Sequence, residues 1–297
     1  MGDEHSIINL GELAKPATVL VEKICDAIGG IAKPWQIKRV AEAEAEAERI
    51  RAAGEVKVTA LHRRAARRFL MEEAKKQHNI ESIIGKALPE VGPNAKSEQV
   101  EDDWIANFFD KCRVISNEQM QTLWAKILAG EANSPGKFSK RTVGLLASLD
   151  KADATMVSTL CGFACSISRQ LVPVIYDYSH EIYSKHGISF SLLSHLESIG
   201  LIRLDLGQNF MYFINGLERT TVVDYFGEVI YVEFAESENT KPEKNEIGIG
   251  RVIFTQAGQQ LAAICGAKPV DGFLEFLKES WSGYATPASK RFGPPQF

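Results

Sequence analysis

The residues that could do chemistry are six histidines, five cysteines and a cluster of basic side chains. The histidines form no HExxH pattern and no pair with a carboxylate at the spacing of zinc ligands. Cys161 and Cys165 lie four positions apart, a spacing that would place both thiols on one face of a helix. A metal or redox pair is one interpretation, but two small core residues are favoured because no other ligand group accompanies them. The chain also has no P-loop, GxGxxG or GxSxG motif. The sequence therefore predicts a protein that is not an enzyme and needs no metal or cofactor.

The basic cluster is the strongest local concentration of charge. It comprises Arg63, Arg64, Arg67, Arg68, Lys75 and Lys76. On a helix the arginines form two rows at i, i+4 spacing, in which like charges repel by a few tenths of a kcal/mol each. Two partners could neutralise these positive charges. One is the acidic tract 42–48 of an antiparallel or staggered neighbouring helix, and the other is the phosphates of nucleic acid or lipid. The first is favoured, since a net charge of −4 and a pI of about 5.9 give no global case for nucleic acid.

The cluster lies in a region, residues 36–88, that is rich in Ala, Glu, Arg and Lys and has few helix breakers. This composition predicts a long helical arm, or two helices joined near Gly54. Most helical stability in water comes from packing, so an arm of this length needs another surface to pack against. The simplest such surface is a second copy, and we therefore expect a homo-oligomer.

The N-terminal segment, residues 1–35, contains an amphipathic stretch over 16–33. Val19, Leu20, Ile24 and Ile28 mark its apolar side. This side is expected to contact a membrane, the protein's own core or a neighbouring subunit, and the scarcity of Lys and Arg on its polar side disfavours the membrane. The sequence contains no run of 18 apolar residues, so no transmembrane helix is expected. The acidic start without a basic leader, together with cysteines that suggest no disulfide framework, predicts a cytoplasmic protein, with membrane association possible on activation.

The most sharply patterned stretch is residues 104–150. Ser116 followed by Gln119 predicts a capping box at the start of a helix. Pro135-Gly136 predicts the turn that ends this helix, and Ser139 is the expected N-cap of the next. The run 85–99, with its two prolines and two glycines, reads as a linker before this region.

The whole chain is therefore expected to be mainly α with a small α+β part. A helical bundle core over 96–168 is expected to follow the arm, then a winged-helix-like α+β module over 169–280 and a flexible tail over 281–297. In that module Ser189 or Ser191 is expected to cap a short helix, Gly200 to end it and Thr255 to cap the closing helix. The candidate recognition helix, FSLLSHLESIG, has no Arg or Lys, which disfavours DNA reading.

The central stretch also carries a resemblance to known proteins. It reads ISNEQMQTLWAKILAGEANSPGKFSKRTVGLLASLDKADA. It resembles an uncharacterised bacterial family known only as a domain of unknown function and, more distantly, the Abi-alpha family, named after abortive infection. The resemblance spans about residues 10–200, and the positions that carry the motif are Trp104, Ser116, Gln119, Trp124, Gly130, Glu131, Pro135, Gly136 and Ser139. It brings no catalytic residue, and it implies a bacterial role in defence against phage.

Two functions from different classes remain open. The first is a non-enzymatic homo-oligomeric assembly protein that senses or arrests infection through contacts with a phage protein, a host protein or a membrane. The second is a winged-helix DNA-binding regulator that uses its winged helix and the Arg63–Arg68 cluster.

Overall fold

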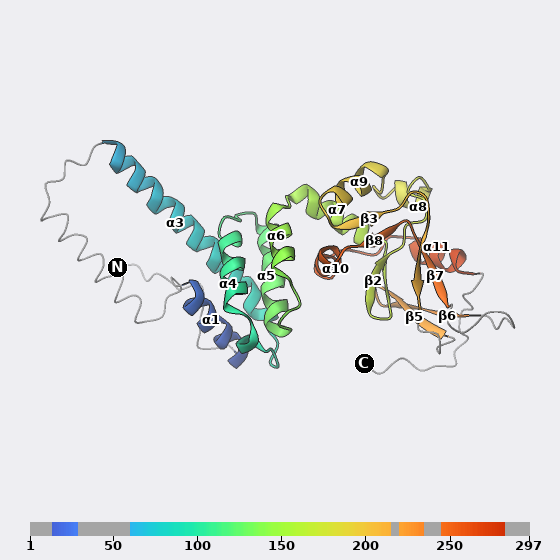
Figure 1. The fold of residues 1–297 in the computed structure, drawn as a ribbon, viewed down its shortest axis with the longest axis horizontal. Helices are drawn as coiled ribbons and strands as arrows, with labels where there is room; N and C mark the ends of the chain where they lie inside the picture. The colour runs from blue at the N-terminus through green and yellow to red at the C-terminus, as the bar shows by residue number, and fades with distance from the viewer. Residues whose placement is uncertain (1–13, 29–59, 215–219, 235–244, 283–297) are drawn as a thin grey trace, which may run out of the picture. The chain divides into compact units, whose positions relative to one another are not determined.

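The computed structural model describes residues 14–28, 60–214, 220–234 and 245–282 (Figure 1). It combines α-helices with antiparallel β-sheets, so the fold is mixed α plus β. The chain divides into an N-terminal unit, residues 1–148, and a C-terminal unit, residues 149–297. The acidic tract 42–48 and the expected tail lie outside the described residues, except for the tail's first two positions.

The described part of the N-terminal unit is helical. Its helices are α1 (Lys15–Ile28), α3 (Ala60–Ala87), α4 (Asp102–Cys112), α5 (Glu118–Asn133) and α6 (Lys140–Ser148). The C-terminal end of α3 packs against α5, while α4 packs against both α1 and α6. The rings of Trp104 and Phe108 are stacked at 5.1 Å, and Phe108 meets Trp124 edge-on at the same separation. These aromatic contacts form the centre of the helical bundle that was expected to follow the arm.

Helix α1 docks on its own protein. Leu20 and Ile24 are fully buried, while Val19 and Ile28 are half-buried. The Nζ of Lys23 donates to the carbonyl oxygens of Glu98 and Val100, and it lies 3.3 Å from the Asp102 carboxylate. The apolar side of α1 is thus occupied by the bundle, in agreement with the interpretation of a helix docked on its own core. No helix among the described residues is both long and apolar enough to cross a membrane.

The expected linker over 85–99 is instead an ordered part of the bundle. Two short 3-10 turns, Leu88–Glu90 and Ser97–Gln99, lie within it. The Asn133 side chain accepts from the Gly92 N–H (2.8 Å) and donates to the Glu90 carbonyl (2.9 Å). The N–H of Lys96 donates to the Ala132 carbonyl at 2.9 Å. The prediction of a linker is wrong because polar groups at the end of α5 satisfy the irregular backbone.

The start of α5 also differs from the expected capping box. The N-cap is Asn117, whose side-chain oxygen accepts from the Met120 N–H at 3.1 Å, and helix α5 begins one residue later. Ser116 and Gln119 are both exposed. Asn caps a helix as well as Ser does, so sequence preference alone could not place the boundary between two neighbouring candidates.

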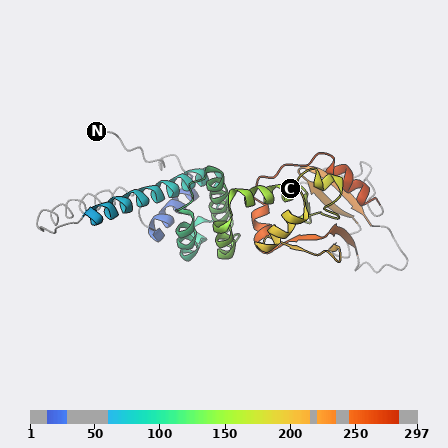
Figure 2. The ribbon, with the colours of Figure 1, turned by 90° about the horizontal axis from the view of Figure 1, so that it is seen from above.

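The C-terminal unit surrounds three antiparallel sheets with short helices. The four-stranded sheet has the order β2-β1-β5-β6, and two-stranded sheets pair β3 with β8 and β4 with β7. Its strands are β1 (Ala164–Ile167), β2 (Gln170–Pro173), β3 (Ile202–Leu204), β4 (Phe210–Phe213), β5 (Thr220–Tyr225), β6 (Glu228–Glu233), β7 (Glu246–Gly250) and β8 (Val252–Phe254). The helices are α7 (Lys151–Cys161), α8 (Glu181–Ser184), α9 (Phe190–Ser198), α10 (Gln256–Ala262) and α11 (Phe273–Ser280). Figure 2 shows these elements from a second direction.

The sequence prediction fails most clearly at the end of the expected helical bundle. The bundle was expected to extend to residue 168, but α7 ends at Cys161 and a hairpin of β1 and β2 follows. Ser168 and Arg169 form the tight turn of this hairpin at φ values of 50° and 66°. Cys161 and Cys165 are both buried but lie on a helix and a strand respectively, so the expectation of a shared helical face is wrong.

Other predictions in this unit are confirmed. Ser189 caps α9 by accepting from the Leu192 N–H, and Thr255 caps α10 by accepting from the Gly258 N–H. Gly200 has φ of +80° just after α9. Aromatic rings form part of the buried core of this unit. The ring of Phe163 contacts those of Tyr183 and Phe273 at centroid distances of 5.2 and 4.9 Å.

Candidate interaction surfaces

The exposed half of α3 is the most unusual surface of the N-terminal unit. The helix extends away from the bundle in Figures 1 and 2. Residues 60–72 are all exposed, whereas Ile80, Ile83 and Ile84 near the other end are buried against the bundle. Most helical stability in water comes from packing, so this exposed half of α3 is expected to be stabilised by a surface that packs on it.

An apolar stripe runs along this exposed half. Phe69 and Leu70 are 61% and 68% exposed, and Ala65 and Ala66 lie one turn before them. Ala66 and Phe69 precede Ile80 by four and three helical turns, so the stripe continues the face that is buried farther along the same helix. We call Ala65, Ala66, Phe69 and Leu70 the α3 stripe. The stripe was not predicted from the sequence, although its spacing from the isoleucines could have indicated it.

The basic cluster covers most of the remaining circumference of the same half-helix. Arg63, Arg64, Arg67, Arg68 and Lys75 are exposed. Arg68 lies 3.5 Å from Glu72, four residues along the helix. Lys76 is half-buried, and its Nζ donates to Glu73 at 2.6 Å. Among the described residues, no acidic neighbour from another element reaches the arginine rows. Exposed pairs of this kind contribute at most about 1 kcal/mol, so the cluster is expected to be a recognition surface more than a source of stability.

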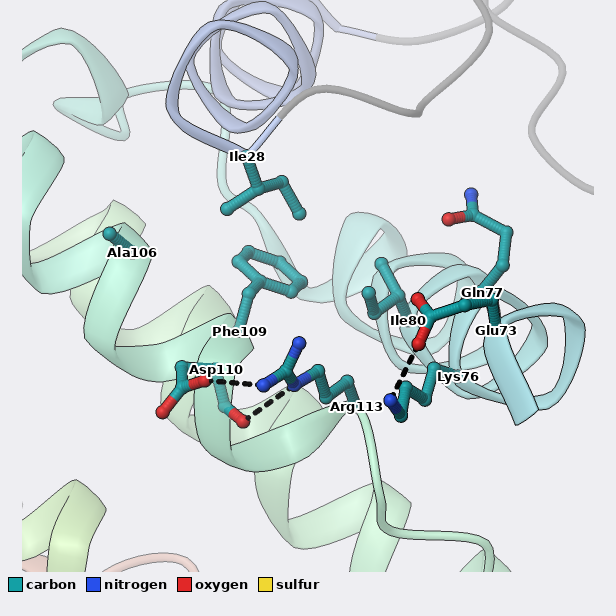
Figure 3. A pocket seen from close by; sticks show the side chains of 9 residues that line it. All are labelled: Ile28, Glu73, Lys76, Gln77, Ile80, Ala106, Phe109, Asp110 and Arg113. Atoms are coloured by element: carbon teal, nitrogen blue, oxygen red, sulfur yellow. Dashed lines mark hydrogen bonds and ion pairs between the residues drawn. The ribbon is translucent and has the colours of Figure 1, made fainter. Parts of the chain in front are cut away.

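A pocket of about 350 Å³ lies between α1, α3 and α4 (Figure 3). Ile28 of α1, Ile80 of α3 and Phe109 of α4 form its apolar walls. Its charged groups are already paired: Arg113 donates to the carboxylate of Asp110 at 2.8 Å and to its carbonyl at 3.2 Å. Lys76 pairs with Glu73 on the opposite wall. The pocket therefore offers apolar contact area more than a charge that awaits a ligand.

The residues of the central motif converge on a loop between α5 and α6. The buried carboxylate of Glu131 accepts from the backbone N–H groups of Gly136 (2.6 Å) and Phe138 (2.8 Å). Gly130 allows the Phe138 ring to approach, because a Cβ there would lie 2.6 Å from the ring atom Cε2. The indole N–H of Trp104 donates to the Phe138 carbonyl at 2.7 Å. Phe138 is thus the centre of the motif, although its residue type alone did not mark it as a candidate.

The other motif positions have structural roles or lie on the surface. Gly136 has φ of +83° in the turn after α5, and Ser139 accepts from the Thr142 N–H at 3.1 Å, which confirms it as the cap of α6. Trp124 is fully buried in the bundle. The motif thus builds a loop and a core, and it presents no reactive side chain to solvent.

Comparison with known proteins identifies the family. The family model described as "Protein of unknown function (DUF2806)" matches residues 63–278. The chain belongs to this family. The DUF2806 match begins within the exposed half of α3 and ends in α11, so it spans both units. It extends farther along the chain than the resemblance over 10–200 suggested, and it does not include α1. Comparison with the curated proteins and with solved structures finds no significant match.

Helix α9 of this DUF2806 chain covers the segment in which a recognition helix was expected. Its one basic side chain, His195, faces α7: Nε2 lies 2.6 Å from Oδ1 of Asp153. The other oxygen of Asp153 accepts from the Asp150 N–H at 2.9 Å, and Asp150 accepts from Asp153 in turn, which completes a capping box. Burial alone raises the pKa of Asp153, but the Asp150 N–H and His195 outweigh it and hold this pKa below its ordinary value of 3.8.

Replacing Asp153 by alanine is expected to lower the free energy of unfolding of the C-terminal unit by about 2 kcal/mol at neutral pH. A carboxylate with a lowered pKa contributes its stability above the unfolded value and loses it as the pH falls through the folded value. The difference between wild type and variant in urea unfolding should therefore shrink below pH 3.8. A difference that stays constant down to about pH 3 would contradict this assignment.

The described residues contain no group of three or more His, Cys, Asp or Glu side chains placed to hold a metal ion. In this part of the chain, Cys25, Cys112, Cys161 and Cys165 are buried and Cys265 is half-buried. Burial raises the pKa of the Cys112 and Cys165 thiols. Thiolate is the reactive form of cysteine, so these two buried thiols are poor nucleophiles.

Proposed function

We propose that this DUF2806 protein is a non-enzymatic interaction protein that assembles with copies of itself through α3. The observation that carries the proposal is the α3 stripe, with Phe69 and Leu70 exposed on a helix that leaves the bundle. Large exposed apolar groups that continue a buried face are typical of interaction sites. The paired charges in the pocket and the structural roles of the central motif also favour binding over catalysis.

We further propose that the assembly acts in defence of a bacterial cell against phage. The support for this step is the resemblance of the central stretch to the Abi-alpha family. In the C-terminal unit, α9 followed by β3, the pairing of β3 with β8 and the closing helix α10 are the order expected of a winged-helix-like module with an enlarged wing. Its short helix carries no Arg or Lys, so the proposed partner of this module is a phage or host protein.

Phage challenge of bacteria that express the chain tests this function. Wild type is expected to give fewer plaques than an empty vector, and Met71→Glu should protect equally. Phe69→Glu combined with Leu70→Glu should remove the protection, because charge on the stripe prevents burial of that face. Equal plaque numbers for wild type and empty vector, or full protection by the double variant, would contradict the proposal.

A second candidate function is DNA binding through the basic cluster. It is favoured by the exposed Arg63, Arg64 and Arg67, for which no ion pair is found among the described residues. Neutralised phosphates release counterions, so such binding would weaken steeply with salt and would be lost when the four arginines are replaced by glutamate. Duplex DNA binding that is absent, or that persists unchanged in this variant, excludes the cluster as a DNA-binding site.

A further inference from the structure

We propose that Cys161 and Cys265 form a redox-active dithiol pair, which a peroxide converts into a disulfide within one chain. Cys161 is the last residue of α7, and Cys265 follows α10 more than 100 residues farther along the chain. Both are thiols in the structure. The pair lies wholly within the C-terminal unit and does not depend on assembly through α3.

The two chain segments that carry these cysteines are fixed against each other by Tyr225. Its buried hydroxyl donates to the Gly162 carbonyl at 2.7 Å and accepts from the Val270 N–H at 2.6 Å. The backbones lie so close that a Cβ on Gly162 would be 3.0 Å from the Lys268 carbonyl oxygen. Gly162 and Gly266, which directly follow the two cysteines, also line one pocket of about 320 Å³. The fold therefore brings the end of α7 and the stretch after α10 together.

The two thiols are themselves in contact. A side-chain hydrogen bond links Cys161 to Cys265. The Sγ of Cys265 donates in turn to the Ala262 carbonyl at 3.3 Å. A thiol has a single hydrogen, so Cys161 is the donor of the bond between the two sulfurs. Sulfur atoms that already share a hydrogen bond need only a small side-chain adjustment to reach bonding distance.

The difference in burial gives the two sulfurs different roles. Cys161 is buried, whereas Cys265 is half-buried and thus within reach of a small oxidant. The hydrogen bond to Cys265, together with burial, raises the pKa of Cys161 well above its ordinary value of 9.0, so the proton stays on the inner sulfur. Thiolate is the form of cysteine that peroxides oxidise. Cys265 is therefore the sulfur expected to react first.

The oxidation balances with hydrogen peroxide as the only other reactant. The sulfur of Cys265 attacks one oxygen, the O–O bond breaks, and the departing hydroxide takes the thiol's proton as water, which leaves a sulfenic acid. The sulfur of Cys161 then attacks the sulfur of this S–OH group. The S–O bond breaks, and the hydroxide leaves with the Cys161 proton as a second water. The two sulfurs lose two electrons, which the peroxide gains, and an S–S bond forms.

Cys165, the partner considered for Cys161 from sequence spacing, has different surroundings. It lies on β1, and burial, followed by the charge of Asp224, raises the pKa of its thiol. The cysteine that shifts the pKa of Cys161 is instead Cys265. The fold thus replaces a pair four positions apart with one that no local pattern in the sequence records.

Mass spectrometry of the full-length wild type tests the pair. The reduced chain is treated with a small excess of hydrogen peroxide, unfolded with its remaining thiols blocked by iodoacetamide, and cleaved with chymotrypsin without reduction. Cleavage after Phe163 separates Cys161 from Cys165, so the cross-linked peptides identify the partner. The expected product in most chains is a disulfide between Cys161 and Cys265, which dithiothreitol should reverse.

Single substitutions separate the roles of the two sulfurs. Cys161→Ala removes the thiol that closes the disulfide, so Cys265 should remain a sulfenic acid and react with dimedone about 10-fold more than in wild type. Cys265→Ser should form no disulfide. Cys165→Ala is the matched control at another buried cysteine, and it should form the disulfide as wild type does.

Three results in wild type would overturn the proposal. The first is a disulfide from Cys265 to another cysteine, in the same chain or in a second copy. The second is oxidation of Cys265 beyond the sulfenic acid while Cys161 stays a thiol, and the third is peroxide treatment that leaves both as thiols. Each result comes from the unsubstituted chain, so a variant that fails to fold does not leave the pair undecided.

Discussion

Replacing Glu131 by alanine is expected to lower the free energy of unfolding of the N-terminal unit by about 3 kcal/mol. The buried carboxylate accepts from the N–H groups of Gly136 and Phe138, and no other acceptor for these groups is seen in the described residues. The loss leaves two donors unsatisfied and opens space beneath the loop that joins α5 to α6. Glutamine should recover only part of the loss, since its amide offers one acceptor oxygen instead of two.

Glu118→Ala is the control for this experiment. Its carboxylate is exposed on the same helix and lies 3.9 Å from Lys86, so its removal should cost less than about 1 kcal/mol. Urea unfolding followed by tryptophan fluorescence, to which Trp104 and Trp124 of this unit contribute, measures both variants. Equal stability of Glu131→Ala and Glu118→Ala would contradict the assigned role.

Replacing Gly250 by alanine is expected to destabilise the C-terminal unit by about 4 kcal/mol, or to prevent its folding. Gly250 has φ of +87°, and an added Cβ would lie 2.0 Å from the Ile175 carbonyl oxygen. That oxygen accepts from the Arg251 N–H at 2.7 Å, while the Ile175 N–H donates to Ile249 at 3.1 Å. The glycine thus allows the segment after β2 to cross the junction of β7 and β8, and a side chain would force the two backbones apart.

Gly227→Ala separates the clash from the conformational strain. Gly227 has φ of +92° in the turn between β5 and β6, and an added Cβ would meet nothing within 4 Å. This variant carries the strain alone and should cost about 1 kcal/mol. Thermal unfolding of the two variants side by side measures the difference. Equal melting temperatures would show that the crossing at Gly250 tolerates a side chain.

Local patterns in the sequence were sufficient to predict much of the helical bundle. Apolar residues recur at helical spacing in α4 and α5. Ser139 marked the start of α6, because an N-cap serine bonds to a backbone N–H only three residues along the chain. The ordered run 85–99 could not be predicted in this way. Its glycines and prolines are typical of linkers, and the groups that fix it, Asn133 and the Ala132 carbonyl, lie more than 30 residues farther along the chain.

The hairpin of β1 and β2 was missed for a related reason. The apolar residues between Met156 and Ile167 fit a helix as well as a buried strand, and such short runs are ambiguous by periodicity. The turn at Ser168-Arg169 lacks the glycine or asparagine that usually marks a tight hairpin. The pairing of β1 with β5 adds a contact more than 50 residues away, which no local pattern records.

The candidate surface was predicted in part. The basic cluster was recognised from sequence because its members are consecutive, and the structure places its arginines on the exposed half of α3. The stripe was not, because Phe69 and Leu70 read as ordinary apolar residues until the buried part of the same helix defines which face they share. The role of Glu131 depends on its burial beneath the loop and could not be inferred from residue type alone.

Light-scattering mass of the purified chain over a wide concentration range, with the 260/280 nm absorbance ratio recorded on the same sample, tests the central claim most directly. The account predicts a defined multiple of 32.8 kDa that is free of nucleic acid and dissociates on dilution. A mass of 32.8 kDa at every concentration would contradict self-assembly through α3. A particle that copurifies with nucleic acid would instead favour the DNA-binding function and make the arginine cluster the first site to replace.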